Sequence, residues 1–253
     1  MMLNKLYQKS KLFFALAFII IYVVGASILD GLSLELGTDK ILTLPFLLLL
    51  SIVLICWLAK NNLFEEYGLR KSTATPKQFL FYIPLIAVAS VNLWLGIKVN
   101  GTFLNVAIYF LTMLLVGFLE ELIFRGLLFN AMKENNLKSA IIVSSVTFGI
   151  GHFINLINGS GADLISNLCQ VVSAVAFGFL FVVIFYKSKS LLPCIITHSV
   201  LNALSVFQNT AKVTQNYTII TSIILTVIAV CYCLYLNKSL SKNKQNKTAL
   251  IDL

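Results

Sequence analysis

Three charged residues, Glu120, Glu121 and Arg125, follow a run from Phe103 to Gly117 in which no side chain carries a charge. On a helix, Glu121 and Arg125 are four residues apart and lie on one face, so we expect an ion pair between them. Glu120 is rotated by about 100° from Glu121, so its carboxylate points elsewhere. A second acid beside a satisfied ion pair is costly inside an apolar helix bundle. We therefore interpret Glu120 as a functional residue; the alternative is that all three form a structural charge cluster.

The two histidines of the chain each have a distinctive partner at helical spacing. Phe148 and His152 are four residues apart, and so are His198 and Asn202, so each pair occupies one face of a helix. A single histidine within a membrane is often a hydrogen-bonded packing residue. Here, however, Glu120, His152, His198 and Asn202 come from three expected helices and can satisfy one another only by converging. The sequence therefore predicts one polar site.

Such a site fits hydrolysis of a peptide bond by activated water. A carboxylate buried among apolar helices has a raised pKa and can accept a proton near neutral pH, and a neighbouring imidazole can share it. Water between Glu120 and His152 would thereby become a nucleophile. His198 and Asn202 could donate hydrogen bonds to the oxyanion that forms at the attacked carbonyl. No Ser-His-Asp arrangement is evident among the neighbouring hydroxyl residues Ser144, Ser145, Thr147 and Ser199.

The elements that carry these residues are membrane helices. The chain is 58% hydrophobic and only 11% charged, which is too apolar for a soluble domain of 253 residues. About 20 apolar residues cross a bilayer as a helix. Eight stretches approach that length: 12–29, 41–59, 79–97, 103–123, 139–157, 166–186, a short one at 191–207, and 217–236. We expect an all-α, polytopic membrane helical bundle of about eight transmembrane helices.

Lysine and arginine residues orient the expected bundle, because positive charge is retained on the cytoplasmic side. With both termini inside, only Lys40, Lys98 and Lys212 lie in outer loops, which leaves 16 of the 19 basic residues inside. This asymmetry also explains the net charge of +9 without any nucleic-acid partner. We expect an integral protein of the plasma membrane. Arg125, toward the inner side of the site, predicts cleavage near the cytoplasmic face.

Function is expected in the second half of the chain. We predict an N-terminal transmembrane scaffold of three helices at residues 1–100, a catalytic core at 101–207, and a last transmembrane helix with a basic cytoplasmic tail at 208–253. In the first part, every charged side chain between Lys11 and Lys98 falls in an expected loop or at the end of a span. No functional residue is predicted there.

Three short motifs occur in order between Gly117 and Ala203, with flanking helices that look ordinary. In their order and approximate spacing they resemble the CPBP family of intramembrane proteases, which includes CAAX prenyl proteases and Abi-type, bacteriocin-processing proteins. Each motif alone is common by chance, but three in order within a multispan protein are fairly specific. They are E-E-x-x-x-R at Glu120, Glu121 and Arg125, F-x-x-x-H at Phe148 and His152, and H-x-x-x-N at His198 and Asn202.

The resemblance implies an eight-helix membrane endopeptidase of the glutamate type, acting on a membrane-associated peptide or protein and requiring no cofactor. It does not distinguish prenylated proteins from bacteriocin-like or signalling peptides, and nothing in the sequence indicates an oligomeric state. It also implies roles for the motif residues: Glu120 and His152 activate water, His198 and Asn202 form the oxyanion site, and Glu121 with Arg125 holds the site together, supported by Phe148.

Three alternatives remain open at this stage. Glu120, His152 and His198 could form a zinc site, although H-E-x-x-H is absent and Asn202 would have no task at a metal. The chain could instead be a non-enzymatic bacteriocin-immunity or scaffold protein that uses its charges for assembly. A transporter is the third alternative, and it is disfavoured because no inverted repeat is evident.

Overall fold

The computed structural model of the chain describes residues 2–99, 101–158 and 161–248, with side chains from residue 3 to residue 240. The predicted domain ends at residues 1, 100 and 249–253 therefore lie outside the described residues. The described part is an all-α helical membrane bundle, apart from one isolated β-bridge between Ile97 and Gln208. Its main helices are α1 (Met2–Lys9), α2 (Lys11–Glu35), α3 (Thr43–Lys60), η1 (Pro76–Tyr82), α4 (Ile83–Ala89), α5 (Phe103–Glu120), η3 (Glu121–Phe129), α6 (Asn130–Lys133), α7 (Leu137–Gly151), η4 (His152–Leu156), α8 (Leu164–Ser188), α9 (Leu192–Ala203), η5 (Leu204–Phe207) and α10 (Gln215–Thr248).

Helices occupy all eight predicted apolar stretches, but they are not equally long. Six of the described helical segments are long and apolar enough to cross a membrane, and they correspond to the first, second, fourth, fifth, sixth and eighth stretches. The other two, Pro76–Ala89 and Leu192–Phe207, are shorter. The predicted third span, residues 79–97, is shifted. It begins at Pro76 and ends at Ala89, and three residues near its start have left-handed backbone, Leu80, Phe81 and Tyr82.

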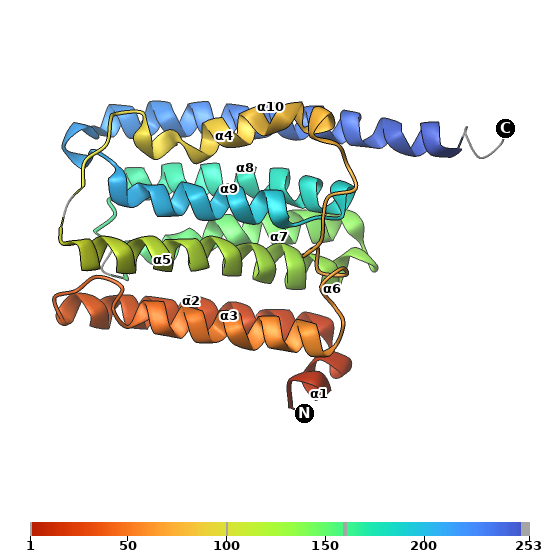
Figure 1. Cartoon of the computed structure of the whole chain (residues 1–253), viewed down its shortest axis with the longest axis horizontal. Coiled ribbons are helices and arrows are strands. Elements are labelled where there is room, and N and C mark those ends of the chain that lie inside the picture. The colour runs from red at the N-terminus through yellow and green to blue at the C-terminus, as the bar shows by residue number, and fades with distance from the viewer. Residues whose placement is uncertain (1, 100, 159–160, 249–253) are drawn as a thin grey trace.

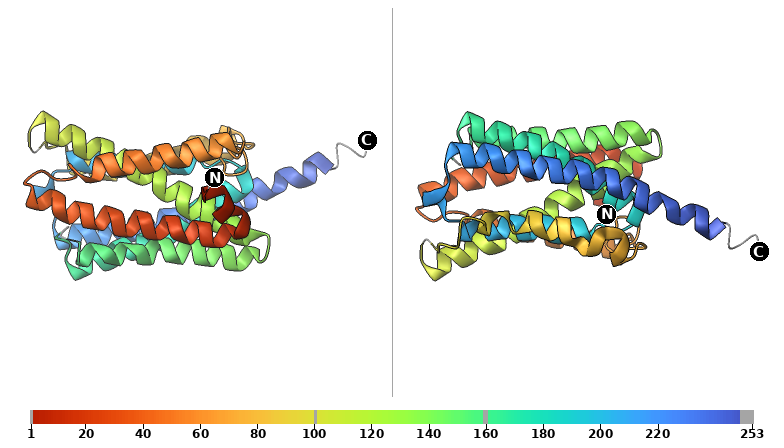
Figure 2. Two further views of the ribbon diagram at one scale, coloured as in Figure 1. Left: turned by 90° about the horizontal axis from the view of Figure 1, so that it is seen from below. Right: turned by 90° about the horizontal axis from the view of Figure 1, so that it is seen from above.

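The helices run side by side along the long axis of the molecule (Figure 1). Helices α2 and α3 form one side, α4 and α10 form the opposite side, and α5, α7, α8 and α9 lie between them (Figures 1 and 2). The close pairs are α8 with α7 and α10, α5 with α9, and α2 with η3. Two apolar clusters fill the interior. One joins the side chains of α2, α3 and η3, and the other joins those of α8, α9 and α10.

Two glycines allow the helices around the site to approach closely. A Cβ atom at Gly117 of α5 would lie 2.4 Å from the backbone nitrogen of Ser199 on α9. A Cβ atom at Gly149 of α7 would lie 2.3 Å from Val175 Cγ2 on α8. Small residues at such crossings let helix backbones pack directly against each other. The crossing at Gly117 therefore brings α9 against the part of α5 that leads into Glu120.

The two ends of the bundle differ in charge. One end carries the N-terminal helix, the connections after α3, α6 and α8, and the C-terminal part of α10 (Figure 1). We call it the basic end, because 16 of the 19 lysine and arginine residues belong to segments at this end. The other end carries the connections after α2, η2 (Val91–Leu93), η4 and η5, and we call it the opposite end.

Candidate functional site

The two glutamates lie where the helix changes type. Helix α5 ends at Glu120, and the next nine residues, Glu121–Phe129, form a π-helix whose residues are all buried. The sequence predicts a regular α-helix here, so the π-helix is a difference that only the structure reveals. Segments of π-helix are rare and occur frequently at functional sites. The change of helix type therefore marks the position of the candidate site.

The predicted ion pair between Glu121 and Arg125 is confirmed. Arg125 Nη1 lies 3.0 Å from Glu121 Oε1, and both side chains are 0% exposed. The same oxygen lies 2.8 Å from Nδ1 of His198 on α9. Glu121 thus binds a cation on its own helical segment and an imidazole on another helix, so it fixes α9 against the π-helix.

The ring of Phe148 packs against Arg125 and against both histidines. The guanidinium carbon of Arg125 lies 3.9 Å from the centre of the Phe148 ring and 5.6 Å from that of Phe181. A desolvated guanidinium over an aromatic face gains about 2 kcal/mol. The Phe148 ring also meets His152 and His198 edge to face, with ring centres 5.2 and 5.7 Å away. Its contacts explain why a phenylalanine at this position supports the site.

Glu120 binds two partners, one of which was not predicted. Its Oε2 lies 3.4 Å from Nε2 of His198, and its Oε1 accepts a 2.7 Å hydrogen bond from the hydroxyl of Tyr22. Both Tyr22 and Glu120 are buried. Tyr22 belongs to α2, in the part of the chain for which the sequence analysis predicted no functional residue. The one available signal was a phenolic hydroxyl within an uncharged run, because a buried tyrosine hydroxyl usually finds a hydrogen-bond partner.

His152 and Asn202 face the site across open space. Glu120, His152 and Asn202 line one cavity of about 400 Å³. His152, His198 and Asn202 line a second cavity of about 380 Å³. Among the described residues, no direct hydrogen bond joins His152 to Glu120, but several polar side chains line the cavity they share, and it is large enough for water. The side chain of Asn167 donates a 2.8 Å hydrogen bond to the carbonyl oxygen of His152 and holds this turn in place.

Three of the four nearby hydroxyl groups donate to helix backbone. Ser144 binds the carbonyl oxygen of Phe124 at 2.8 Å, and Ser199 binds that of Leu114 at 2.9 Å. Thr147 binds a carbonyl within its own helix. These bonds lock helices together and do not connect a hydroxyl to an imidazole. The geometry therefore offers these three hydroxyl groups no base that would activate them as nucleophiles.

The described residues include no group of three His, Cys, Asp or Glu side chains arranged to hold a metal ion. Both ring nitrogens of His198 face carboxylates, Nδ1 toward Glu121 and Nε2 toward Glu120. With no such group among the described residues, we derive no step through a zinc ion.

One comparison with known proteins matches the part of the chain that contains this site. A family model described as type II CAAX prenyl endopeptidase Rce1-like matches residues 102–204. This segment contains all seven motif residues and runs from the start of α5 to the end of α9. No curated protein and no solved structure matches the chain. The buried cluster of Glu120, Glu121 and His198 lies within the matched segment, and the chain carries a domain of the Rce1-like type II CAAX prenyl endopeptidase family, which is a family of membrane proteases.

Proposed function

We propose that this chain is an intramembrane endopeptidase that hydrolyses a peptide bond of a membrane-associated protein or peptide with water activated by Glu120 and His152. The observation that carries the proposal is the position of Glu120. Its carboxylate is held by Tyr22 and faces His198, and it lines the same cavity as His152 and Asn202. A fixed carboxylate, an imidazole and an amide around one polar cavity are the groups that water-dependent peptide hydrolysis needs.

In the proposed reaction, water lies between the Glu120 carboxylate and the His152 ring. As the water oxygen bonds to the carbonyl carbon, Glu120 accepts one of its protons and the carbonyl electron pair moves to oxygen. The side-chain amide of Asn202 and an N–H at Nε2 of His198 donate hydrogen bonds to that oxyanion. When the C–N bond breaks, Glu120 returns the proton to the amine that leaves. The products are a carboxylic acid and an amine, and Glu120 is restored.

Glu121 and Arg125 position these groups in the proposed mechanism. Because Glu121 accepts a hydrogen bond from Arg125 through the same oxygen that faces His198, we assign Nδ1 of His198 as a second donor to it. This fixes the orientation of the imidazole, so Nε2 is the nitrogen that faces Glu120. Phe148 holds the guanidinium in place from its other side. The proposed roles of these three residues are therefore structural support for the atoms that meet the substrate.

The proposal also states in which membrane the protein lies and which segments of the chain form the catalytic core. The six long apolar helices make the chain an integral membrane protein. We place it in the plasma membrane with the basic end in the cytoplasm, because the imbalance of basic residues favours this orientation. Residues 101–207 would form the catalytic core. Residues 1–100 would do more than act as a scaffold, since they supply Tyr22 to the site.

A comparison of membrane-associated and released peptides tests the proposal. Cells would carry the wild type, Glu120→Gln, or the control Glu65→Gln, which changes an exposed glutamate to the same amide. We expect peptides that depend on the wild type to disappear in Glu120→Gln and to persist in Glu65→Gln, at equal protein levels by immunoblot. If Glu120→Gln and His152→Ala both retain the wild-type peptides and cellular function, the endopeptidase proposal is rejected and a binding or scaffold role replaces it.

A further inference from the structure

The site is closed toward the basic end. All nine residues of the π-helix Glu121–Phe129 are buried, and Arg125 fills the space between the Phe148 and Phe181 rings. Neither of the two cavities at the site is lined by any described residue of the basic-end connections 61–75, 134–136 and 189–191. A peptide coming from the basic end would have to displace a packed core.

The cavity that contains Glu120 extends in the other direction along α2. Tyr22 touches Glu120, and Ser27 and Asp30 of the same helix also line the cavity. Tyr22 and Asp30 are eight residues apart, which corresponds to about 12 Å along a helix axis. The cavity therefore reaches from the candidate catalytic carboxylate to the opposite end of the bundle, where α2 ends and the connection to α3 begins.

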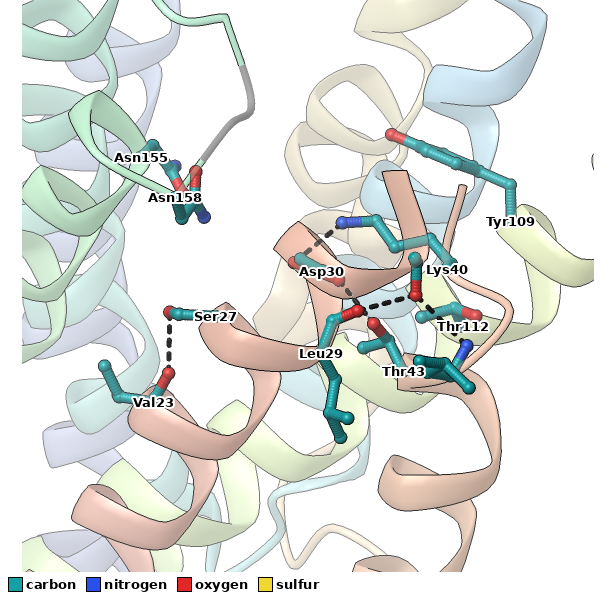
Figure 3. Close-up of polar contacts among 12 residues, drawn as sticks. Val23, Ser27, Leu29, Asp30, Lys40, Thr43, Tyr109, Thr112, Asn155 and Asn158 are labelled. Atoms are coloured by element: carbon teal, nitrogen blue, oxygen red, sulfur yellow. Dashed lines mark hydrogen bonds and ion pairs between the residues drawn. The ribbon is translucent and has the colours of Figure 1, made fainter. Parts of the chain in front are cut away.

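Polar groups surround the cavity at that end (Figure 3). Lys40 Nζ lies 2.8 Å from Asp30 Oδ2, with both side chains 16% exposed, and the Thr43 hydroxyl binds the other oxygen of Asp30. Tyr109 of α5 and Asn155 of η4 also line the cavity. An ammonium group has three N–H donors, so Lys40 can bind a peptide carbonyl without leaving Asp30.

We propose that the substrate enters the site from the opposite end, as an extended peptide segment that passes the Asp30–Lys40 ion pair and reaches Glu120. An extended chain advances about 3.3 Å per residue, so about four residues fill the path of about 12 Å. The polar lining stabilises the main chain of such a segment. The inference rests on the proposed function, because it identifies the side from which that activity receives its substrate.

The direction of entry decides the class of substrate. With the basic end in the cytoplasm, the cavity opens to the extracytoplasmic face. The substrate is then an exported or membrane-anchored protein with an extended segment outside the cytoplasm. This differs from the expectation of cleavage near the cytoplasmic face, which came from the position of Arg125. Arg125 does lie toward the basic end, but it is part of the packing that closes the site there.

Cysteine labelling in intact cells tests the route of entry. In a variant with all five native cysteines replaced, single cysteines are introduced by Ser27→Cys in the cavity, Lys212→Cys in the loop at the opposite end, and Lys138→Cys at the basic end. The probe is a small, charged, membrane-impermeant methanethiosulfonate. We expect Ser27→Cys and Lys212→Cys to react in intact cells, and Lys138→Cys to react only after permeabilisation.

Two results would overturn the inference. One is reaction of Ser27→Cys only under the conditions that expose Lys138→Cys, which would place the opening at the cytoplasmic face. The other is no reaction of Ser27→Cys on either side while the cysteines at positions 138 and 212 both react, which would show that the cavity is closed. Labelling does not require cleavage, so these results are independent of the Glu120→Gln comparison. An active enzyme with an unreactive Ser27→Cys would reject the route of entry alone.

Discussion

Removal of Arg125 should be the most damaging single change to the stability of the candidate site. Its guanidinium and the Glu121 carboxylate are 3.0 Å apart and fully buried, and Arg125→Ala would leave Glu121 without its cation. Breaking a buried ion pair from one side costs about 3 to 5 kcal/mol. Loss of the guanidinium from the Phe148 face adds up to about 2 kcal/mol. His198 remains 2.8 Å from Glu121, and its hydrogen bond to the carboxylate offsets part of this loss.

We therefore expect Arg125→Ala to lower the free energy of unfolding by about 3 to 5 kcal/mol. The assay is unfolding in mixed micelles followed by tryptophan fluorescence, with the yield of folded protein as a second measurement. Arg70→Ala is the matched control, because Arg70 forms an exposed pair with Glu65. Such surface pairs contribute about 0 to 1 kcal/mol.

A double-mutant cycle isolates the ion pair from general effects of truncation. Arg125→Ala combined with Glu121→Gln removes both charges, so it should be less destabilising than the sum of the two single changes. The difference should exceed about 1 kcal/mol for a directly contacting buried pair. Normal yield and near wild-type stability of Arg125→Ala, or strict additivity in the cycle, would refute the reasoning that this pair holds the site together.

Three further changes should have distinct effects. Tyr22→Phe removes one hydrogen bond to a charged acceptor, worth about 1.5 to 3 kcal/mol, so we expect a roughly 10- to 100-fold slower cleavage at normal yield; an unchanged rate would dismiss the contact with Glu120. Gly117→Ala should lower yield through its clash with Ser199, and a normal melting temperature would contradict the close packing of α5 against α9. Asp163 is the N-cap of α8, and hydrogen bonds from the side chain and backbone of Ser166 lower its pKa. The cap therefore stabilises the fold above the pKa of Asp163 in the unfolded chain. This stability is lost as the pH falls through the lower pKa of the folded protein. The protection factors of the amides in the first turn of α8, which are exchange rates corrected for their intrinsic pH dependence, should therefore fall at acidic pH in the wild type but be independent of that titration in Asp163→Asn.

The sequence by itself determined the features that depend on local spacing. Apolar runs of membrane-spanning length identified the helices, because each run must shield its backbone from lipid wherever it packs. The spacing of four between Glu121 and Arg125 was sufficient for their ion pair, since such neighbours lie on one face of a helix. The pairs Phe148–His152 and His198–Asn202 indicated one shared polar site for the same reason.

Only the tertiary structure decided what depends on how the helices are rotated and packed against one another. Tyr22 and Glu120 are 98 residues apart, and their hydrogen bond follows from the rotation of α2 about its axis. The bridging position of His198, between Glu120 and Glu121, requires the close crossing of α5 and α9 at Gly117. The direction in which the cavity opens has the same origin, because it is the space left between helices rather than a property of any one of them. No local pattern encodes such a space, since residues far apart along the chain form its walls.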